Sequence, residues 1–136
     1  MIRILLCCAG GFSSSALAAG VEKEIVENNL QDEFYIEFAP FSLAKEKMSA
    51  FDVILFCPHL QFEVKRMVKT LSPDKPMYIL PPRMYGLMRF QELSLDAVDV
   101  IELYKQTKMK PVHFPGEENT MRLTRHVAYR NFKSQA

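Results

Sequence analysis

The fold of this chain is decided by the stretch Ile2-Arg3-Ile4-Leu5-Leu6-Cys7-Cys8-Ala9-Gly10-Gly11-Phe12-Ser13-Ser14-Ser15. The apolar run at its start is typical of a central parallel strand, and residues 13 to 29 carry apolar side chains at helical spacing. A helix that begins directly after a strand presents unpaired N–H groups and the positive end of its dipole. The thiol of Cys8 is therefore predicted to lie where an anion binds and where a thiolate is favoured over a thiol.

The rest of the chain repeats the alternation of strand and helix. Three more strands are predicted at Phe34 to Phe38, Asp52 to Phe56 and Met77 to Leu80. Helices are predicted from Gln61 to Leu71 and from Leu93 to Tyr104, with a short helix or loop from Phe41 to Met48 and a turn from Ser72 to Pro76. The packing positions expected in the helix from Gln61 are Phe62, Val64, Met67, Val68 and Leu71. The pattern predicts the α/β class: a single-domain three-layer α/β/α sandwich with a parallel sheet between helices.

Residues from about 108 onward break this rhythm at Pro111, Pro115 and Gly116. We therefore divide the chain into a domain at 1–107 and a C-terminal extension at 108–136, in which a last helix is predicted from Asn119 to Lys133. That helix carries Arg122, Arg125, Arg130 and Lys133. We expect it to pack on its own domain with a solvated basic face, the alternative being a docking surface for a partner or a membrane.

Composition narrows the class of function. With 136 residues and a net charge of +1, the chain fits one domain and favours neither nucleic acid nor an anionic membrane as its main partner. Three cysteines and three histidines show no metal-ligand spacing, which indicates reduced thiols and implies no metal or cofactor. No apolar run approaches the roughly 18 residues of a membrane span, and no signal peptide is recognisable, so we expect a cytoplasmic protein without direct membrane insertion.

The segment Cys8-x-x-Gly11-x-Ser13-x-Ser15 resembles the phosphocysteine loop of the IIB components of the bacterial phosphoenolpyruvate-dependent sugar phosphotransferase system, in the lactose/cellobiose (chitobiose) class. The resemblance spans about Met1 to Lys105 and includes Asp52-Val53-Ile54-Leu55, Lys75-Pro76 before the fourth strand, and Tyr85-Gly86 before the last helix of the domain. It implies a four-stranded parallel sheet of order 2-1-3-4. It further implies a phosphocarrier transferase in which Cys8 accepts a phosphoryl group from a IIA histidine. The acceptor is a disaccharide held by the membrane IIC component, through which the protein would associate peripherally with the membrane.

The chemistry of the loop also follows from its residues. The phosphate-binding groups expected are the backbone N–H groups and hydroxyls of Ala9, Gly10, Gly11, Phe12, Ser13, Ser14 and Ser15. A cysteine-dependent phosphatase of the low-molecular-weight type has Cys-x5-Arg, and Ser14 stands where that arginine is needed. A loop without this guanidinium can still hold a phosphoryl group, but it accelerates hydrolysis of that group less than a phosphatase loop does. This property favours a carrier over a phosphatase. A regulatory or redox-sensing relative that uses Cys7 and Cys8 is the other alternative.

Two neighbouring thiols compete for the role of nucleophile. Counting the family pattern from Cys8 reaches Gly11 and Ser13, whereas counting from Cys7 reaches Gly10 and Phe12. We therefore assign the nucleophile to Cys8 and expect Cys7 to be a small buried hydrophobe. Cys57, at the end of the third strand, is expected in the core. Phe12 either forms part of an apolar rim for the IIA partner or simply packs.

Two further residues are candidate accessory groups. His59 and Arg83 follow the third and fourth strands, and loops at the carboxyl ends of parallel strands border one crevice. Either side chain would then contact the phosphate, the alternative for each being a solvated loop residue. A guanidinium from Arg83 would partly replace the arginine that the loop lacks.

Overall fold

The computed structural model describes residues 1–8, 11–71, 74–82, 84, 89–115, 117, 125 and 127–131, with the side chains of residues 8 and 11–18 outside the description. The strands are β1 (Ile2–Cys8), β2 (Phe34–Pro40), β3 (Val53–Phe56) and β4 (Met77–Ile79). The α-helices are α1 (Gly11–Glu27), α2 (Ala44–Lys47), α3 (Gln61–Leu71) and α5 (Phe90–Thr107). Short 3₁₀ helices cover Phe41–Leu43, Met48–Ala50 and Pro58–Leu60.

The strands form one parallel sheet in the order β2-β1-β3-β4. In β1, Leu6 lies opposite Phe38 of β2 and Leu55 of β3, and in β3 Leu55 lies opposite Tyr78 of β4. The central position of β1 explains its continuous apolar run, because a strand covered on both faces needs apolar residues throughout. The predicted α/β class and the strand order 2-1-3-4 are confirmed.

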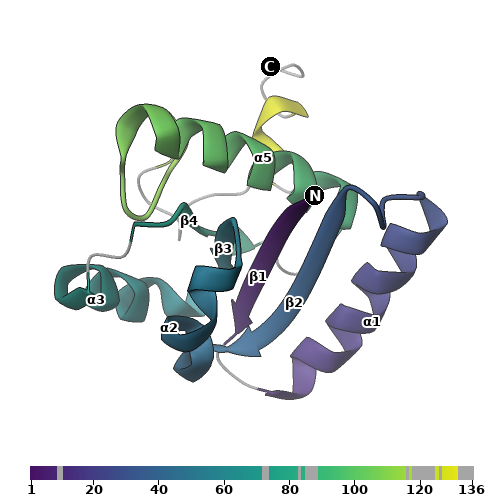
Figure 1. The fold of residues 1–136 in the computed structure, drawn as a ribbon, viewed down its shortest axis with the longest axis horizontal. Helices are drawn as coiled ribbons and strands as arrows, with labels where there is room; N and C mark the ends of the chain where they lie inside the picture. Colours follow the sequence, from purple (N-terminus) through teal and green to yellow (C-terminus); the bar gives the residue numbers. More distant parts are fainter. Residues whose placement is uncertain are drawn as a thin grey trace.

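Alternation along the strands divides the core into two halves. In β1, Ile4 and Leu6 belong to one cluster of buried side chains, and Leu5 and Cys7 belong to the other. Helices α1 and α5 complete the first cluster, and α2 and α3 complete the second. Figure 1 shows this layering, with α1 and α3 on opposite sides of the sheet and α5 running across the end where β1 begins. Because all four strands are parallel, their carboxyl ends lie at one edge of the sheet.

Helix α3 has the predicted bounds but buries fewer side chains than the sequence indicated. Val64 and Met67 are buried, whereas Phe62 is 68% exposed and Leu71 is 47% exposed. The prediction that these two residues pack in the core is wrong. Phe62 lies two residues before Val64, which turns it to the opposite side of a helix with 3.6 residues per turn, and Leu71 ends the helix.

The segment after α5 joins the same core. The N–H of Val112 donates to the carbonyl of Met77 at 2.7 Å, and Val112 forms an isolated parallel bridge with Tyr78, so it covers the outer edge of β4. Val112 and Phe114 are buried in the cluster of α1 and α5, and Ala128 is fully buried. The division of the chain after Thr107 stays a prediction.

The predicted helix from Asn119 to Lys133 is only partly present among the described residues. A single helical turn covers residues 129–131 and lies on α5 in Figure 1, but Arg125, Val127 and Ala128 are not helical. The N–H groups of Ala128 and Tyr129 donate to the carboxylates of Glu92 and Asp96 on α5. These tertiary bonds take the place of the carbonyl partners that a continuous helix would supply. Residues 118–124, 126 and 132–136, including Arg122 and Lys133, lie outside the described residues.

Candidate functional site

The backbone places Cys8 at the end of a central strand and immediately before a helix. Cys8 is the last residue of β1, opposite Pro40 of β2, and α1 begins at Gly11. Ala9 and Gly10 lie between them and are outside the described residues, as are the side chains of the predicted loop residues from Phe12 to Ser15. The strand and the helix predicted to flank the loop are therefore both present in the backbone.

The electrostatics of α1 suit an anion at its start. The helix has 17 residues and no acidic residue in its first turn. Its first N–H groups have no carbonyl partners within the helix, and no carboxylate in that turn offsets their partial positive charge. An incoming phosphoryl group at Gly11 would meet these N–H groups and not a competing negative side chain.

The other two cysteines are core residues. Cys7 is fully buried and Cys57 is 1% exposed, and both belong to the cluster that α2 and α3 cover. The N–H of Cys57 donates to the carbonyl of Cys7 at 3.1 Å, which continues the pairing of β3 with β1 by one residue. Both positions agree with the expectation of small buried hydrophobes.

The candidate accessory residues follow β3 and β4 at this same edge. His59 is exposed in the 3₁₀ helix that begins at Pro58, between the buried residues Pro58 and Leu60. The N–H of Leu80 donates to the carbonyl of Phe56 at 2.9 Å, so Pro81 leaves the sheet at the level of Cys57. Parallel strands are about 4.8 Å apart, which puts β4 roughly 10 Å from β1. Arg83 and the predicted Tyr85-Gly86 pair lie outside the described residues.

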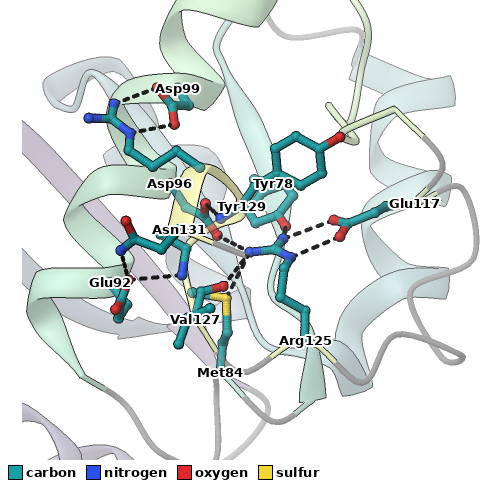
Figure 2. Close-up of polar contacts among 12 residues, drawn as sticks. Tyr78, Met84, Glu92, Asp96, Asp99, Glu117, Arg125, Val127, Tyr129 and Asn131 are labelled. Carbon is teal, nitrogen blue, oxygen red and sulfur yellow. Dashed lines mark hydrogen bonds and ion pairs between the residues drawn. The ribbon is translucent and has the colours of Figure 1, made fainter. Parts of the chain in front are cut away.

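A buried ion cluster lies between β4 and α5, and the sequence analysis did not predict it. The Arg125 side chain is 1% exposed and is paired with Asp96 and Glu117, whose side chains are 0% and 9% exposed. The Arg125 Nε and Nη2 atoms donate to the Glu117 carboxylate at 2.8 Å each, and Nη1 donates to Asp96 at 2.9 Å. Further donations reach the Tyr78 hydroxyl, the Val127 carbonyl and the Met84 thioether (Figure 2). Both expectations of a solvated or docking basic face are therefore wrong for Arg125.

The cluster contains two carboxylates and one guanidinium, and their burial and mutual contacts shift the pKa values of its ionisable groups. Burial raises the pKa of Asp96 from 3.8 to about 6, against the opposing effect of Arg125. Burial also raises the pKa of Tyr78 well above its usual value. Burial alone would lower the pKa of Arg125, but its hydrogen bond to Glu117 and the nearby acidic groups raise it. Arg125 therefore stays charged while Asp96 is the group that titrates near neutral pH.

One sequence signal pointed to this cluster. The buried residues of α5 are Phe90, Leu93, Ser94, Asp96, Ala97, Val100 and Tyr104. A carboxylate among apolar residues on the inner face of a helix needs a buried partner, because an unpaired buried charge is strongly disfavoured. The signal identifies Asp96 but not its partner, since Arg125 lies 29 residues away.

The contribution of Asp96 to stability should decrease as the pH rises. Its pKa is about 6 in the folded chain against 3.8 in the unfolded one, so the folded chain binds this proton more tightly. The resulting stabilisation is complete below about pH 3.8 and is lost as the pH passes 6. We expect the free energy of unfolding of the wild type, minus that of Asp96→Asn, to fall by about 1 kcal/mol between pH 5 and pH 7.5 in urea titrations. A difference that is constant or increases with pH would contradict this assignment.

The described part of the chain contains no group of three or more His, Cys, Asp or Glu side chains placed to hold a metal ion. It also contains no helix long and apolar enough to cross a membrane.

The comparisons with known proteins agree on one family. The model of the lactose/cellobiose-specific IIB subunit of the phosphotransferase system matches residues 3–112. The solution structure of the cellobiose-specific phosphotransferase IIB component from Borrelia burgdorferi is similar, with a TM-score of 0.61 and 28% identity over 75% of this chain and 93% of that one. A lactose-specific IIB domain from Streptococcus pneumoniae gives a TM-score of 0.47 and 15% identity over 79% of this chain and 98% of that one. No curated protein sequence matches the chain significantly.

The family match, from residue 3 to residue 112, includes β2, β3 and β4, all of β1 except Ile2, and helices α1, α2, α3 and α5. It also includes Cys8 at the end of β1. The strand order also agrees with the order that the resemblance implied from the sequence. This chain belongs to the lactose/cellobiose-specific IIB family of the phosphotransferase system.

Proposed function

We propose that the chain is the phosphocarrier of a sugar phosphotransferase system, acting as a protein-phosphohistidine–sugar phosphotransferase with Cys8 as its nucleophile. Cys8 accepts a phosphoryl group from a histidine of a IIA component and passes it to a disaccharide bound by a membrane IIC component. The peripheral association with the membrane, through IIC, follows from the same proposal. No other cofactor or metal is needed for this chemistry.

The position of Cys8 in the backbone carries the proposal. In a chain that matches the IIB family over residues 3–112, this cysteine ends the central strand β1, and α1 starts three residues later with no acidic residue in its first turn. The helix dipole lowers the pKa of a nearby thiol and attracts a phosphoryl group. Ser14 occupies the position of the phosphatase arginine, which favours transfer to a partner over hydrolysis by water.

The two transfers balance as nucleophilic displacements at phosphorus. In the first, the Cys8 thiolate forms an S–P bond while the N–P bond of the phosphohistidine breaks, and the leaving ring nitrogen recovers the electron pair and takes up a proton. In the second, a sugar hydroxyl oxygen forms an O–P bond, the S–P pair returns to sulfur, and the hydroxyl proton is lost. The backbone N–H groups of residues 9–12 and the hydroxyls of Ser13, Ser14 and Ser15 hold the phosphoryl oxygens between the two steps.

The proposal predicts which thiol carries phosphorus. After incubation with phosphoenolpyruvate, the general phosphotransferase proteins and a matching IIA component, wild type and Cys7→Ser should each gain the mass of one phosphoryl group. Cys8→Ser should gain none, because a serine hydroxyl is not ionised at neutral pH and is a far weaker nucleophile than a thiolate. Intact-mass spectrometry measures the gain.

Cys7→Ser is a matched control because it makes the same replacement of sulfur by oxygen at the adjacent residue. The Cys7 thiol is buried, so a urea titration of Cys7→Ser should confirm that this variant is folded. Phosphorylation of Cys8→Ser at the wild-type level would rule out Cys8. Absence of phosphorylation in folded wild type with several IIA components would instead favour the regulatory or redox-sensing relative.

A further inference from the structure

The sheet has two edge strands, β4 and β2, and among the described residues only β4 is covered (Figure 1). At the β4 edge, the N–H of Val112 donates to the carbonyl of Met77. Strand β2 pairs with β1 on one side, and no described segment pairs with its other side. An uncovered edge strand presents unpaired N–H and C=O groups that a further strand can join.

The register with β1 shows which backbone groups of β2 point outward. The N–H of Ile2 donates to the carbonyl of Glu33 at 2.9 Å, and Ile2 lies opposite Phe34. Glu33 and every second residue after it therefore bond toward β1, and the residues between them bond away from it. The residues of β2 that point outward are Phe34, Ile36, Phe38 and Pro40.

These four residues leave two donors open. Proline has no N–H, and the N–H of Phe34 donates to the carbonyl of Leu30 at 3.0 Å. For the N–H groups of Ile36 and Phe38, the described part of the chain provides no acceptor. A partner strand must therefore offer carbonyl groups to these two positions.

The sequence of β2 lacks the features that usually keep an edge strand from pairing. The strand is seven residues long, its register with β1 is continuous, and it contains neither Lys nor Arg. Its one charged residue, Glu37, is paired with Lys47 at 2.6 Å. Tyr35 is 40% exposed beside it. The edge is thus long, regular and nearly neutral.

A second copy of β2 satisfies both open donors when it runs antiparallel about a two-fold axis at Ile36. In an antiparallel pair, every second pair of opposite residues exchanges two N–H···O bonds. The two Ile36 residues then exchange two bonds, and the N–H of each Phe38 donates to the Phe34 carbonyl of the other copy. No outward N–H of β2 is left without an acceptor.

The same register places complementary side chains opposite one another. Tyr35 lies opposite Glu37 of the other copy, and its hydroxyl can donate to that carboxylate as it donates to Glu37 of its own chain at 3.1 Å. On the face that α1 covers, the half-buried rings of Phe34 and Phe38 lie opposite each other.

Two other registers also satisfy the open donors but suit the side chains less well. A pairing centred on Glu37 would set two carboxylates directly opposite each other, which is unfavourable. A pairing centred on Phe38 would set Glu37 opposite Ala39, whose side chain offers no hydrogen bond. The side chains therefore select the register centred on Ile36.

We propose that two copies of this chain associate through β2, antiparallel and centred on Ile36, so that their two four-stranded sheets become one continuous sheet. The contact is isologous, so it closes as a dimer and does not extend into a fibre. Cys8 lies opposite Pro40 at the carboxyl end of β1, and the two-fold axis sends the two carboxyl edges to opposite ends of the joint sheet. The inference does not depend on the phosphocarrier function.

Sedimentation velocity of the wild type over a range of concentrations tests the association. We expect a reversible dimer with a Kd on the order of 100 μM, because four backbone bonds between two strands make a small interface. A wild type that stays monomeric up to about 1 mM would overturn the inference.

The side chain of Tyr35 gives a matched pair of variants. Tyr35→Glu should weaken the dimer by about 10-fold or more, because each dimer then contains two pairs of directly opposed carboxylates. Tyr35→Gln has the same size without the charge and should stay within about 3-fold of the wild-type Kd, because its amide can donate to Glu37. Tyr35 is exposed, and urea titrations should show both variants folded. Equal Kd values for the two variants would contradict the proposed contact.

Cross-linking tests the register. Chains with Tyr35→Cys and chains with Glu37→Cys are prepared in a Cys8→Ser background, where the remaining native thiols, Cys7 and Cys57, are buried. Opposite residues at a position without backbone bonds have Cα atoms about 4.5 Å apart, which a disulfide can span. Each disulfide formed reduces one molecule of oxidised glutathione to two thiols.

We expect oxidised glutathione to cross-link an equimolar mixture of the two chains into dimers with one chain of each kind, and to leave each chain alone largely monomeric. Cross-linking of Glu37→Cys with itself would place the axis at Glu37, and no cross-linking of the mixture would exclude the antiparallel pairing; either result overturns the inference. Phosphorylation of Cys8 enters none of these measurements, so the dimer and the phosphocarrier function are tested separately.

Discussion

Replacing Arg125 with methionine should lower the free energy of unfolding by about 3–5 kcal/mol. The substitution keeps an apolar stem of similar length but removes the cation that faces Asp96 and Glu117. Both carboxylates are at least nine-tenths buried, and removing one partner of a buried ion pair leaves the other without compensation. The Tyr78 hydroxyl and the Val127 carbonyl lose a donor as well.

Urea unfolding at pH 7 measures this loss, and Arg130→Met is the control. Arg130 lies in the same segment and pairs with Asp99 at 2.6 Å, but its side chain is 47% exposed, so its removal should cost less than about 1 kcal/mol. Combining Arg125→Met with Asp96→Asn and Glu117→Gln should recover part of the loss, because the buried negative charges are removed along with the positive one. A loss for Arg125→Met no larger than that for Arg130→Met would show that the cluster contributes little.

Ending the chain after Thr107 should abolish stable folding. The truncation removes Val112 from the edge of β4, and it removes Phe114, which is 3% exposed, from the core cluster of α1 and α5. Loss of a buried phenylalanine side chain costs about 3–5 kcal/mol, and loss of Arg125 adds a cost of similar size. Together they are comparable with the whole stability of a small domain, about 5–15 kcal/mol.

Circular dichroism and urea titration of residues 1–107 test this expectation, with residues 1–131 as the matched control. The longer variant keeps all of the described contacts of Phe114, Arg125 and Tyr129 and should unfold cooperatively at the wild-type urea concentration. A cooperative transition of residues 1–107 near that of wild type would instead support a domain that ends at Thr107 and an extension that folds on it separately.

The position of Cys8 could be predicted from the sequence because every signal for it is local. The apolar run before it, the two glycines after it and the helical pattern that follows lie within about 30 residues. A strand buried on both faces must be apolar throughout, and a helix that follows it at once must start beside its carboxyl end. The same reasoning placed His59 after β3 and expected Cys7 and Cys57 in the core, and their surroundings in the structure agree.

The prediction of a solvated basic helix near the C-terminus was wrong for Arg125, because the same spacing of basic residues occurs whether an arginine is exposed or buried against acidic partners. A helical spacing of arginines predicts a solvated face, but the backbone at Arg125, Val127 and Ala128 is not helical. The N–H groups of Ala128 and Tyr129 donate to the carboxylates of Glu92 and Asp96 on α5, and not to carbonyl groups of a helix of their own. Helix propensity is weak compared with several such bonds to buried or charged groups.

The sequence by itself determined the parallel α/β architecture, the order of its elements and the strand-to-helix position of Cys8, because hydrophobic periodicity and turn residues act between near neighbours in the chain. Only the tertiary structure decided that Arg125 is buried, that Val112 covers the edge of β4, and that Met84 is held between β4 and α5. The physical reason is that a buried charge is stable only when its partners are brought to it, and here they come from positions 8, 29, 41 and 47 residues away in sequence.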